Sequence, residues 1–454
     1  MMDSDVIAAI STPHGIGAVG IVRLSGSNVM DVFRRIFGDG EYESHRMYYG
    51  QIVNGGEVID EVMACCMLAP RSYTREDTVE IYAHGGVATL YGVLNAALDN
   101  GARLALPGEF TKRAFLNGRI NLTQAEAVMD LIGAASSAAR RAGLRQLGGG
   151  LGRRITSGRD RLLFWLANIE LSIDYPEHED EAINRDTILA EGESWLADMN
   201  ALLKTAEVGR VLRDGIKTAI LGRPNAGKST LLNAVLGEDR AIVHEIPGTT
   251  RDVLTERVQL GDVVLQLMDT AGIRQTSDPI ESIGVEKSYQ AAQDAKLVIY
   301  VMDRSLPPTD EDLEILDRLN DELCHVLIVL NKCDLPPAEG WDKRQVGLNA
   351  HYISAQNRDG LGGLYESIQE KFLQGGLSGA FGQDDIITRQ RHMDILQSAI
   401  AHVRRAMDEF RAGVAEDLVS IGLREAYTAL GEILGLEVSD DIVDRIFSEF
   451  CVGK

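Results

Sequence analysis

The sequence predicts a multidomain protein of the α/β plus all-α class, in which a mostly parallel α/β domain is inserted into a helical domain. Its 454 residues exceed what one ordinary hydrophobic core can organise. Ala, Leu, Arg and Glu recur at helical spacing in residues 119–210, and helical spacing returns in residues 379–454. Between these stretches, residues 211–378 alternate strand-like and helix-like runs, which is the pattern of a parallel sheet.

Residues 1–118 predict a smaller α/β domain, because short alternating apolar runs are separated by turn signals. The segment Gly15–Gly20 matches the dinucleotide-binding pattern G-x-G-x-x-G. A strand-like run, Gly20–Leu24, follows it, where a dinucleotide site requires a helix. We therefore interpret these glycines as a turn between two strands.

Both helical stretches carry an apolar face that is typical of core packing rather than of a ligand site. These faces are marked by Trp165, Ile169 and Ile173 in the first stretch, and by Leu423, Tyr427, Leu430 and Leu434 in the second. We expect the two stretches to pack together, with the parallel domain inserted between them.

The composition excludes several classes of protein. A hydrophobic content of 45% excludes a wholly disordered chain, and no apolar run approaches the roughly 18 residues of a membrane span. The acidic start, Met1–Asp5, has no signal or transit character. The five cysteines show neither disulfide nor zinc spacing, so we expect a reducing cytoplasm.

The net charge is 45 − 68, or −23, which argues against broad affinity for nucleic acid. Residues 101–161 are an exception, because they hold eleven Lys or Arg and four acidic residues, a balance of 11 − 4, or +7. Two interpretations remain open for this stretch: a face for an anionic partner, or an ordinary solvated helix surface.

The most informative motif lies at the start of the inserted domain. Gly222-Arg223-Pro224-Asn225-Ala226-Gly227-Lys228-Ser229 fits the pattern G-x-x-x-x-G-K-[ST], between a strand-like run and a helix-like run. Such a loop turns its backbone N–H groups onto phosphate oxygens, and the following helix N-terminus adds positive potential. We expect Lys228 to reach the β- and γ-phosphates and Ser229 to ligate Mg²⁺.

A second motif, Asn331-Lys332-Cys333-Asp334, follows another strand-like run. The Asp334 carboxylate can accept from both N–H donors of guanine, and adenine has no such pair on that edge. Asn331 can brace the loop or contact the base, and the stem of Lys332 can cover the ring. Ser354-Ala355 closes the pocket. The two motifs together predict GTP rather than ATP.

Two intervening segments have the form of nucleotide switches. Asp269-Thr270-Ala271-Gly272 ends a strand-like run, so that Asp269 is expected in the Mg²⁺ shell and the Gly272 N–H at the γ-phosphate. Gly248-Thr249-Thr250-Arg251-Asp252 lies in a polar loop, where Thr250 is a candidate second Mg²⁺ ligand. Such segments become ordered when the γ-phosphate is present.

The position after the second switch is Ile273, which cannot orient a water molecule as glutamine does in many GTPases. Glu281 is the nearest candidate for that role, although an exposed glutamate at a helix start is an open alternative. Arg251 and Arg274 are possible arginine fingers without further support. The Asn225 side-chain oxygen suits a monovalent cation, which could supply the missing positive charge.

These segments, with Ile280-Glu281-Ser282-Ile283-Gly284 and the carboxyl end Phe450-Cys451-Val452-Gly453-Lys454, resemble the MnmE (TrmE) family of tRNA modification GTPases. The resemblance covers the whole chain. It implies a P-loop GTPase domain at 211–378, a helical domain at 119–210 and 379–454, and a folate-binding and dimerisation domain at 1–118. It also implies a cytoplasmic homodimer without membrane attachment. This dimer hydrolyses GTP with K⁺ and, in a heterotetramer or larger complex with MnmG (GidA), modifies carbon 5 of the wobble uridine of certain tRNAs.

The same resemblance implies residue roles around the nucleotide. Asn225 would bind K⁺ together with the carbonyl groups of His244, Ile246 and Thr249, and Glu281 would orient the attacking water. The nucleotide and its cations would contact three segments: 225–230, which ends in Ser229 and Thr230; the loop 244–250, with Glu245, Pro247 and Gly248; and 269–272, with Thr270 and Ala271.

In the N-terminal domain, the resemblance implies a site for 5-formyl-tetrahydrofolate or a related folate, with Arg23, Glu80, Arg119 and Lys454 as its residues. Some relatives have Lys where this chain has Arg119, which keeps the charge but changes the contact geometry. Cys451 is either a catalytic thiolate or a small apolar residue that closes the last turn, and both interpretations stay open.

Two functions remain at this stage. One is an enzyme that couples GTP hydrolysis to tRNA modification. The other is a GTP-controlled switch in ribosome assembly, because related bacterial GTPases share the phosphate loop. An assembly switch has no use for a folate site, so Arg23, Glu80 and Lys454 discriminate between them.

Overall fold

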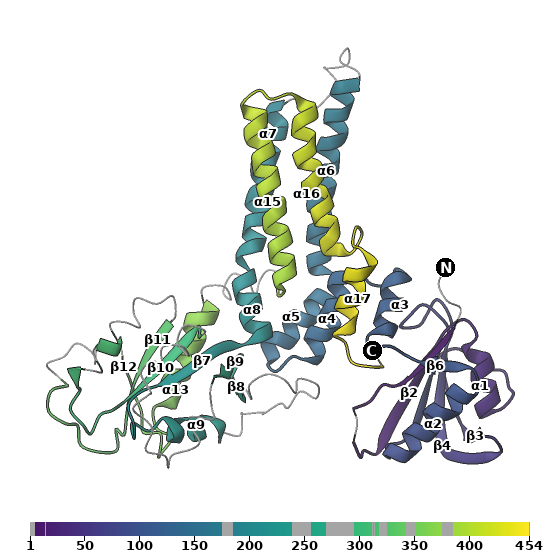
Figure 1. The fold of residues 1–454 in the computed structure, drawn as a ribbon, viewed down its shortest axis with the longest axis horizontal. Helices are drawn as coiled ribbons and strands as arrows, with labels where there is room; N and C mark the ends of the chain where they lie inside the picture. Colours follow the sequence, from purple (N-terminus) through teal and green to yellow (C-terminus); the bar gives the residue numbers. More distant parts are fainter. Residues whose placement is uncertain are drawn as a thin grey trace. The chain divides into compact units, whose positions relative to one another are not determined.

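The computed structural model describes residues 5–13, 15–174, 185–237, 256–268, 295–310, 312, 314–316, 325–341, 350–374 and 385–453. The chain divides into two compact units. The first unit comprises Met1–Met129, Gly152–Ala182 and Ala415–Lys454, and the second comprises Asp130–Leu151 and Ile183–Val414. The predicted class is confirmed, because α/β elements and long helices occur in both units (Figure 1).

The first unit is organised around a six-stranded sheet with the order β3-β4-β5-β2-β1-β6. All neighbouring strands are antiparallel except β1 and β6. The strands are β1 (Val6–Ile10), β2 (Val19–Ser25), β3 (Arg46–Asn54), β4 (Glu57–Met67), β5 (Thr78–His84) and β6 (Ala102–Leu104). The glycines of the segment 15–18 lie between β1 and β2, which confirms the predicted turn and excludes the dinucleotide fingerprint.

The two faces of this sheet differ because side chains alternate along each strand. Helices α1 (Val29–Phe37) and α2 (Val87–Asp99) cover one face, and apolar residues such as Val22, Leu24 and Ile81 are buried there. The other face carries Arg23 on β2 and Glu80 on β5, which are directly opposite each other in the strand register. The sheet therefore places these two candidate site residues together.

Helix α3 (Glu109–Leu116) packs Phe110 against Ile7 and Ala9 of β1, on the face that carries Arg23. The unit also contains most of α4 (Leu122–Ile132) and α6 (Gly150–Asp174), together with α16 (Glu416–Leu434) and α17 (Asp440–Ser448). The apolar end of α17 packs on α4, because Phe447 of α17 and Phe450 just after it share a buried cluster with Leu122. This packing brings the last residues of the chain next to the sheet.

The predicted apolar faces are largely confirmed in α6 and α16. Trp165, Ile169, Leu423, Leu430 and Leu434 are buried. Tyr427 is half-buried, and the Arg159 guanidinium carbon lies 3.9 Å from its ring centroid. The expectation for Ile173 was wrong, because this side chain is 45% exposed in the last turn of α6, at the edge of the described helix.

In the second unit a six-stranded sheet has the order β12-β11-β10-β7-β9-β8. Its strands are β7 (Ile216–Leu221), β8 (Glu256–Leu260), β9 (Val263–Leu267), β10 (Leu297–Asp303), β11 (His325–Asn331) and β12 (Ala350–Tyr352). All neighbouring pairs are parallel except β8 and β9, which confirms the predicted mostly parallel sheet. The helix α9 (Lys228–Leu236) follows β7, and α13 (Leu361–Gln369) continues into the π-helix η4 (Glu370–Gln374).

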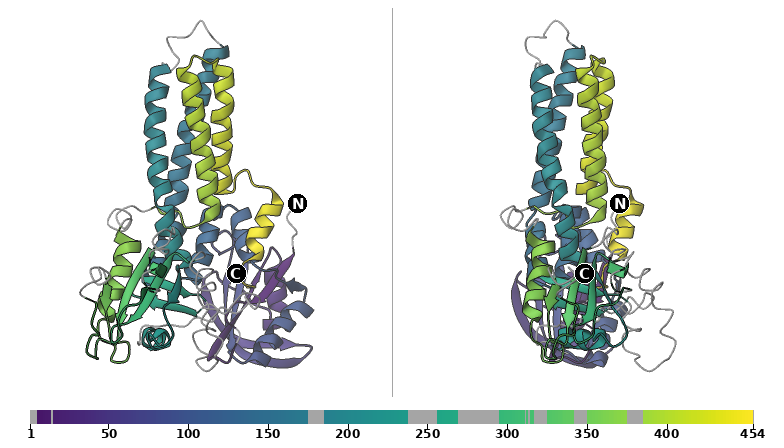
Figure 2. Two further views of the ribbon diagram at one scale, coloured as in Figure 1. Left: turned by 60° about the vertical axis from the view of Figure 1, so that its left-hand side comes forward. Right: turned by 90° about the vertical axis from the view of Figure 1, so that its left-hand side faces the viewer.

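Helices precede and follow this sheet in the chain, as the predicted insertion requires. They are α5 (Ser137–Leu147), α7 (Arg185–Lys204) and α8 (Ala206–Asp214) before it, and α15 (Gln390–Arg411) after it. Helices α7 and α15 lie side by side (Figure 2). The Ile387 N–H donates to the Thr205 hydroxyl over 3.1 Å. This bond joins the segment that leads from α7 into the sheet to the segment that leads from the sheet into α15. In the part of the chain that the structure describes, no helix has the length and apolarity needed to cross a membrane.

Several basic side chains of the stretch 101–161 form ion pairs within the first unit. Arg103, Lys112 and Arg159 form ion pairs with Glu109, Asp444 and Glu437.

Arg113, which is 11% exposed, contacts Asp5, Glu76 and Glu109. Burial acts to raise the pKa of Glu109, but hydrogen bonds from Arg103, the Leu106 N–H and Arg113 hold that pKa below its usual value. These charges therefore stabilise the junction between the sheet and α3.

The depressed pKa of Glu109 leads to a pH-dependent prediction. We expect Glu109→Gln to lower the free energy of unfolding of the first unit by about 1–3 kcal/mol at pH 7, because two arginines lose a charged acceptor. A carboxylate with a depressed folded-state pKa contributes fully above its unfolded value of 4.5 and loses that contribution as the pH falls below it. Urea unfolding at several pH values should therefore show a difference from wild type that is constant above about pH 5 and shrinks below it.

A matched control for this experiment is Asp31→Asn. The Asp31–Arg34 pair has side chains that are 62% and 40% exposed, so its loss should cost less than about 0.5 kcal/mol. An equal effect of the two substitutions, or a difference independent of pH, would contradict the role given to Glu109.

Candidate functional site

The phosphate loop lies between β7 and α9, at the carboxyl end of the parallel strands where ligands bind in open α/β sheets. The Lys228 ammonium donates to the carbonyl oxygens of Gly222 and Arg223 over 2.8 and 3.0 Å, across the mouth of the loop. Asn225 has φ +62°, a left-handed conformation that asparagine tolerates better than most residues. Ser229 and Thr230 lie in the first turn of α9. The loop and the helix start thus have the form predicted from the motif.

Asn331 braces the phosphate loop, which is one of the two roles expected for it. It is 2% exposed at the end of β11. Its Nδ2 donates to the Ala226 carbonyl oxygen over 3.0 Å, and its Oδ1 accepts from the Ala355 N–H over 3.0 Å. One amide therefore ties together the phosphate loop, the end of β11 and the segment at 354–355.

Gly227 makes this close approach possible. It has φ +99°, and a Cβ added to it would lie 2.1 Å from the Asn331 Nδ2 atom. The absence of a side chain lets the loop backbone lie against the Asn331 amide directly before the helix start, and a glycine loop before a helix N-terminus is the arrangement that binds phosphate. This cradle fits the triphosphate of a nucleotide.

Two side-chain contacts fix the residues that are expected to bind the guanine base. The Ser354 hydroxyl donates to the Asp334 carboxylate over 2.6 Å, and the Lys332 ammonium contacts the Asp303 carboxylate over 2.6 Å. Burial acts to raise the pKa of Asp303, but the Lys332 ammonium and Ser305 hold it below its usual range. Asp334 is thereby oriented as an acceptor, and Lys332 is held along the edge of the pocket.

Asp303 was not among the residues predicted from the sequence. Its signal is its place as the last residue of β10, which pairs in parallel with β11 and so ends beside Asn331.

Several predicted nucleotide and cation residues lie outside the described residues: Glu281, the switch loop with His244, Glu245, Ile246, Pro247, Gly248, Thr249 and Thr250, and the segment with Asp269, Thr270, Ala271 and Gly272. Among the residues that are described, no group of three or more His, Cys, Asp or Glu could hold a metal ion. The predicted cation ligands among the described residues are Ser229 and Asn225, which offer a hydroxyl and an amide oxygen and so do not belong to such a group.

A second group of predicted residues meets in the first unit. The Arg23 Nε and Nη2 atoms contact the Glu80 Oε1 atom over 2.8 and 2.7 Å, and both side chains are less than one-fifth exposed, at 17% and 15%. The Tyr82 hydroxyl donates to the other Glu80 oxygen over 2.7 Å. Burial, with the hydrogen bond to Glu80, raises the pKa of Tyr82 to about 12, so this phenol stays a donor at neutral pH.

Arg119 is joined to this group through Tyr73. The Arg119 Nη1 atom donates to the Tyr73 carbonyl oxygen over 3.1 Å, and its guanidinium carbon lies 4.7 Å from the Tyr73 ring centroid. The Arg23 guanidinium carbon lies 5.7 Å from the same ring and 5.7 Å from the Phe110 ring. Tyr73 and Tyr82 were not among the residues predicted from the sequence. The two-residue period of β5 that places Glu80 on this face also places Tyr82 there.

The carboxyl end of the chain reaches the same place. The Gly453 carbonyl oxygen accepts from the Ser11 hydroxyl over 3.1 Å and from Arg23 Nη1 over 3.5 Å. Gly453 has φ +91°, and a Cβ on it would lie 2.4 Å from the Ile10 carbonyl oxygen, so only glycine fits.

Cys451 is exposed, and its carbonyl oxygen accepts from the Gly108 N–H over 3.4 Å. Its side chain is exposed, and the interpretations as a catalytic thiolate and as a small apolar residue that closes the last turn both stay open. Lys454 lies outside the described residues.

Comparison with known proteins gives matches along nearly the whole chain. The family model described as the MnmE helical domain matches residues 122–451, and that described as the GTP-binding protein TrmE N-terminus matches residues 6–119. The "tRNA modification GTPase MnmE" of Finegoldia magna is 44% identical over 99% of this chain and 100% of its own length. The protein of the same name from Bacillus subtilis is 42% identical over 99% of this chain and 100% of its own length.

Among solved structures, the G domain of the T. maritima FeoB iron transporter matches 34% of this chain and 97% of its own length. That match has 25% identity and a TM-score of 0.24, which is too low to establish a relationship of fold.

The contact between Gly227 and Asn331 leads to a second prediction. We expect Gly227→Ala to weaken binding of a fluorescent GDP analogue by at least about 100-fold, because the new methyl group displaces the Asn331 amide and φ is left-handed. Gly363→Ala is the matched control, since Gly363 lies on α13 with no atom within 4 Å of its added Cβ. The control should bind normally and gain up to about 1 kcal/mol of stability. Normal binding by Gly227→Ala would contradict the proposed cradle.

Proposed function

Because the chain belongs to the MnmE family of tRNA modification GTPases, we propose that it couples K⁺-activated GTP hydrolysis to modification of carbon 5 of the wobble uridine in certain tRNAs. The one-carbon unit comes from 5-formyl-tetrahydrofolate or a related folate. The chain acts as a cytoplasmic homodimer in a complex with MnmG. A single observation carries this proposal: one chain has a guanine-nucleotide loop and, separately, a partly buried Arg–Glu–Tyr group closed by its own carboxyl end.

The nucleotide loop has the groups that GTP hydrolysis needs. Lys228 leaves its two loop carbonyl partners for the β- and γ-phosphates when the nucleotide binds. Asp334, oriented by Ser354, accepts from the two guanine donors. In this proposal Ser229 contributes to the Mg²⁺ shell and Asn225 to the K⁺ shell, and these cations supply positive charge to the transferring phosphoryl group. Glu281 holds the attacking water.

The Arg23–Glu80 group suits a reduced folate. A carboxylate that is fixed by Arg23 and Tyr82 presents acceptor oxygens to the N–H donors of a pterin ring. The rings of Tyr73 and Phe110 supply aromatic surface beside Arg23. Lys454, at the end of the tail that Gly453 fixes, adds a positive charge. A switch for ribosome assembly, the other function consistent with the nucleotide motifs, has no use for this second site.

The proposal is tested on tRNA nucleosides from cells that lack this protein. Loss of the carbon-5 modification of the wobble uridine, with its return on complementation by the wild-type gene, supports the proposed function. Unchanged nucleosides together with defective ribosomal subunits would favour the assembly switch instead.

The role of K⁺ is tested at Asn225. We expect Asn225→Ala to bind GTP with Mg²⁺ but to lose the rate increase of K⁺ over Na⁺, by roughly 100-fold or more for a charge-stabilising group. Asn225→Gly is the control for backbone strain, because glycine adopts the left-handed φ of +62° without penalty. Both variants should lose the K⁺ effect. A loss with Ala alone, or a wild type that hydrolyses GTP equally in the two salts, would contradict the role of the Asn225 oxygen.

The role of the carboxyl end is tested at Gly453. We expect Gly453→Ala to reduce wobble-uridine modification strongly and to leave GTP hydrolysis unchanged, because the added Cβ pushes the tail away from β1. Val452→Ala is the matched control, since this neighbouring side chain is 47% exposed and should tolerate truncation. Full modification by Gly453→Ala would remove the tail from the site.

A further inference from the structure

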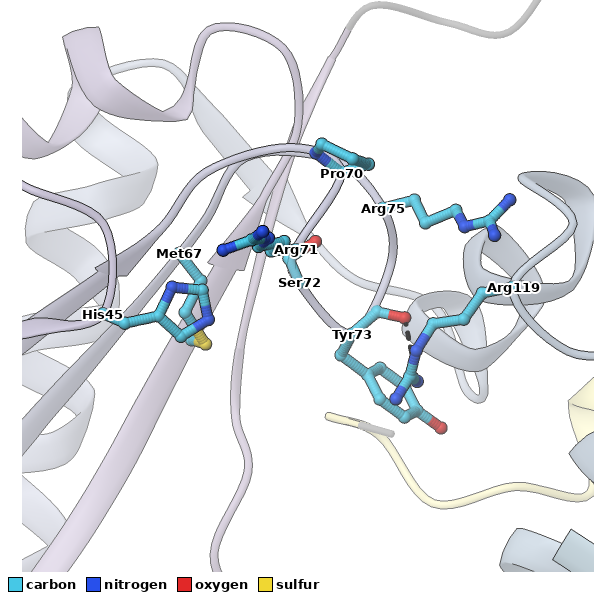
Figure 3. A pocket seen from close by; sticks show the side chains of 8 residues that line it. All are labelled: His45, Met67, Pro70, Arg71, Ser72, Tyr73, Arg75 and Arg119. Carbon is cyan, nitrogen blue, oxygen red and sulfur yellow. Dashed lines mark hydrogen bonds between the residues drawn. The ribbon is translucent and has the colours of Figure 1, made fainter. Parts of the chain in front are cut away.

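The first unit has a hollow of about 510 Å³ beside the Arg23–Glu80 group. Its lining includes Arg71, Arg75, Arg119 and His45 (Figure 3). Arg71 and Arg75 come from the loop after β4, Arg119 from the segment after α3, and His45 from the turn before β3. Arg71 and His45 lie on one side, and Arg75 and Arg119 on the other. The sequence analysis assigned Arg119 to the folate, but it assigned no role to Arg71, Arg75 or His45.

The three arginines of this hollow are not neutralised by carboxylates. Arg75 donates to the Asn117 carbonyl oxygen over 3.0 Å, and Arg119 donates to that of Tyr73. Within the described ranges, none of the three forms an ion pair.

The nearest acidic residues of the same loop are engaged elsewhere. Asp77 accepts from the Ala69 N–H over 2.8 Å, and Glu76 pairs with Arg113. In a chain of net charge −23, three uncompensated guanidinium groups around one hollow indicate an anionic ligand.

One aromatic ring, that of Tyr73, links the hollow to the Arg23–Glu80 group. The Tyr73 ring lies 5.7 Å from the Arg23 guanidinium carbon and 4.7 Å from that of Arg119. On one side of this ring Glu80 offers acceptor oxygens, and on the other the arginines offer donors with positive charge. A single ligand with N–H donors at one end and carboxylates at the other matches both sides.

We propose that this hollow binds the carboxylates of a poly-γ-glutamyl chain on the folate. The inference rests on the folate function proposed above and extends it to the class of folate that the site prefers. Arg119 contacts the first glutamate, and Arg71 and Arg75 contact the carboxylates that follow, since guanidinium groups pair with carboxylates in two-point contacts. A nucleic-acid backbone would instead require an extended basic stripe, whereas these arginines surround one hollow.

Equilibrium dialysis on the full chain tests this inference, with 5-formyl-tetrahydrofolate as its monoglutamate and as its triglutamate. We expect the wild type to bind the triglutamate about tenfold more tightly, because one charged hydrogen-bonded pair is worth about that factor. This preference should fall as the salt concentration rises. Arg71→Gln and Arg75→Gln should each bind the monoglutamate within about twofold of wild type and lose most of the preference.

Arg35→Gln is the matched control. Arg35 is an exposed arginine of the same unit whose Nη1 atom donates to the Asn100 carbonyl oxygen over 3.0 Å, as Arg75 does to Asn117. It lies on α1, which covers the other face of the sheet. The control should keep the full preference for the triglutamate, and a matching loss in it would overturn the assignment.

The remaining outcomes separate this inference from the function on which it rests. Equal binding of the two forms by the wild type overturns the inference and leaves the folate function standing. Failure of both forms to bind overturns both. An unchanged glutamate preference in Arg71→Gln and Arg75→Gln, with weakened binding of an anticodon stem-loop RNA, overturns the inference and assigns the hollow to RNA.

Discussion

The hydrogen bonds that the Gly453 carbonyl oxygen accepts from Ser11 and Arg23 are the constraint on which the candidate folate site depends. They join residues separated by 442 and 430 positions in the chain, so the first unit is complete only when its last segment returns to β1 and β2. The packing of Phe447 and Phe450 against Leu122 brings the tail to this point. The parallel sheet, from β7 to β12, lies in the chain between these two ends.

In the second unit, hydrogen bonds likewise join the segment that enters the parallel sheet to the segment that leaves it. The Thr205 hydroxyl accepts from the Ile387 N–H, and Thr388 donates to Asp130 and Gln146. These buried contacts hold the chain that enters the sheet through α8 beside the chain that leaves it toward α15.

The nucleotide loop could be predicted from the sequence almost to the residue, because its chemistry is local. The strand that ends at Leu221 and the helix that begins at Lys228 flank a motif whose glycine spacing has one structural solution. The site in the first unit was different. Its residues come from β2, β5, the loop before β5, the segment after α3 and the chain end, and periodicity does not connect them. Arg23, Glu80 and Arg119 were therefore named only through the family resemblance. Tyr73, Tyr82 and the hollow of arginines needed the strand register and the tertiary packing. The exposed Ile173 shows the same limit, since helical spacing does not say where a helix loses its partner.

The most direct test of this account is the folate affinity of a chain that lacks Val452–Lys454, measured by equilibrium dialysis beside its rate of GTP hydrolysis. The account predicts that the truncated chain binds 5-formyl-tetrahydrofolate at least about tenfold more weakly, since Arg23 loses its tail contact and the Lys454 charge is removed. It also predicts that GTP hydrolysis is unchanged, because the nucleotide loop lies in the other unit. Undiminished folate affinity in the truncated chain would contradict the claim that the carboxyl end completes the site.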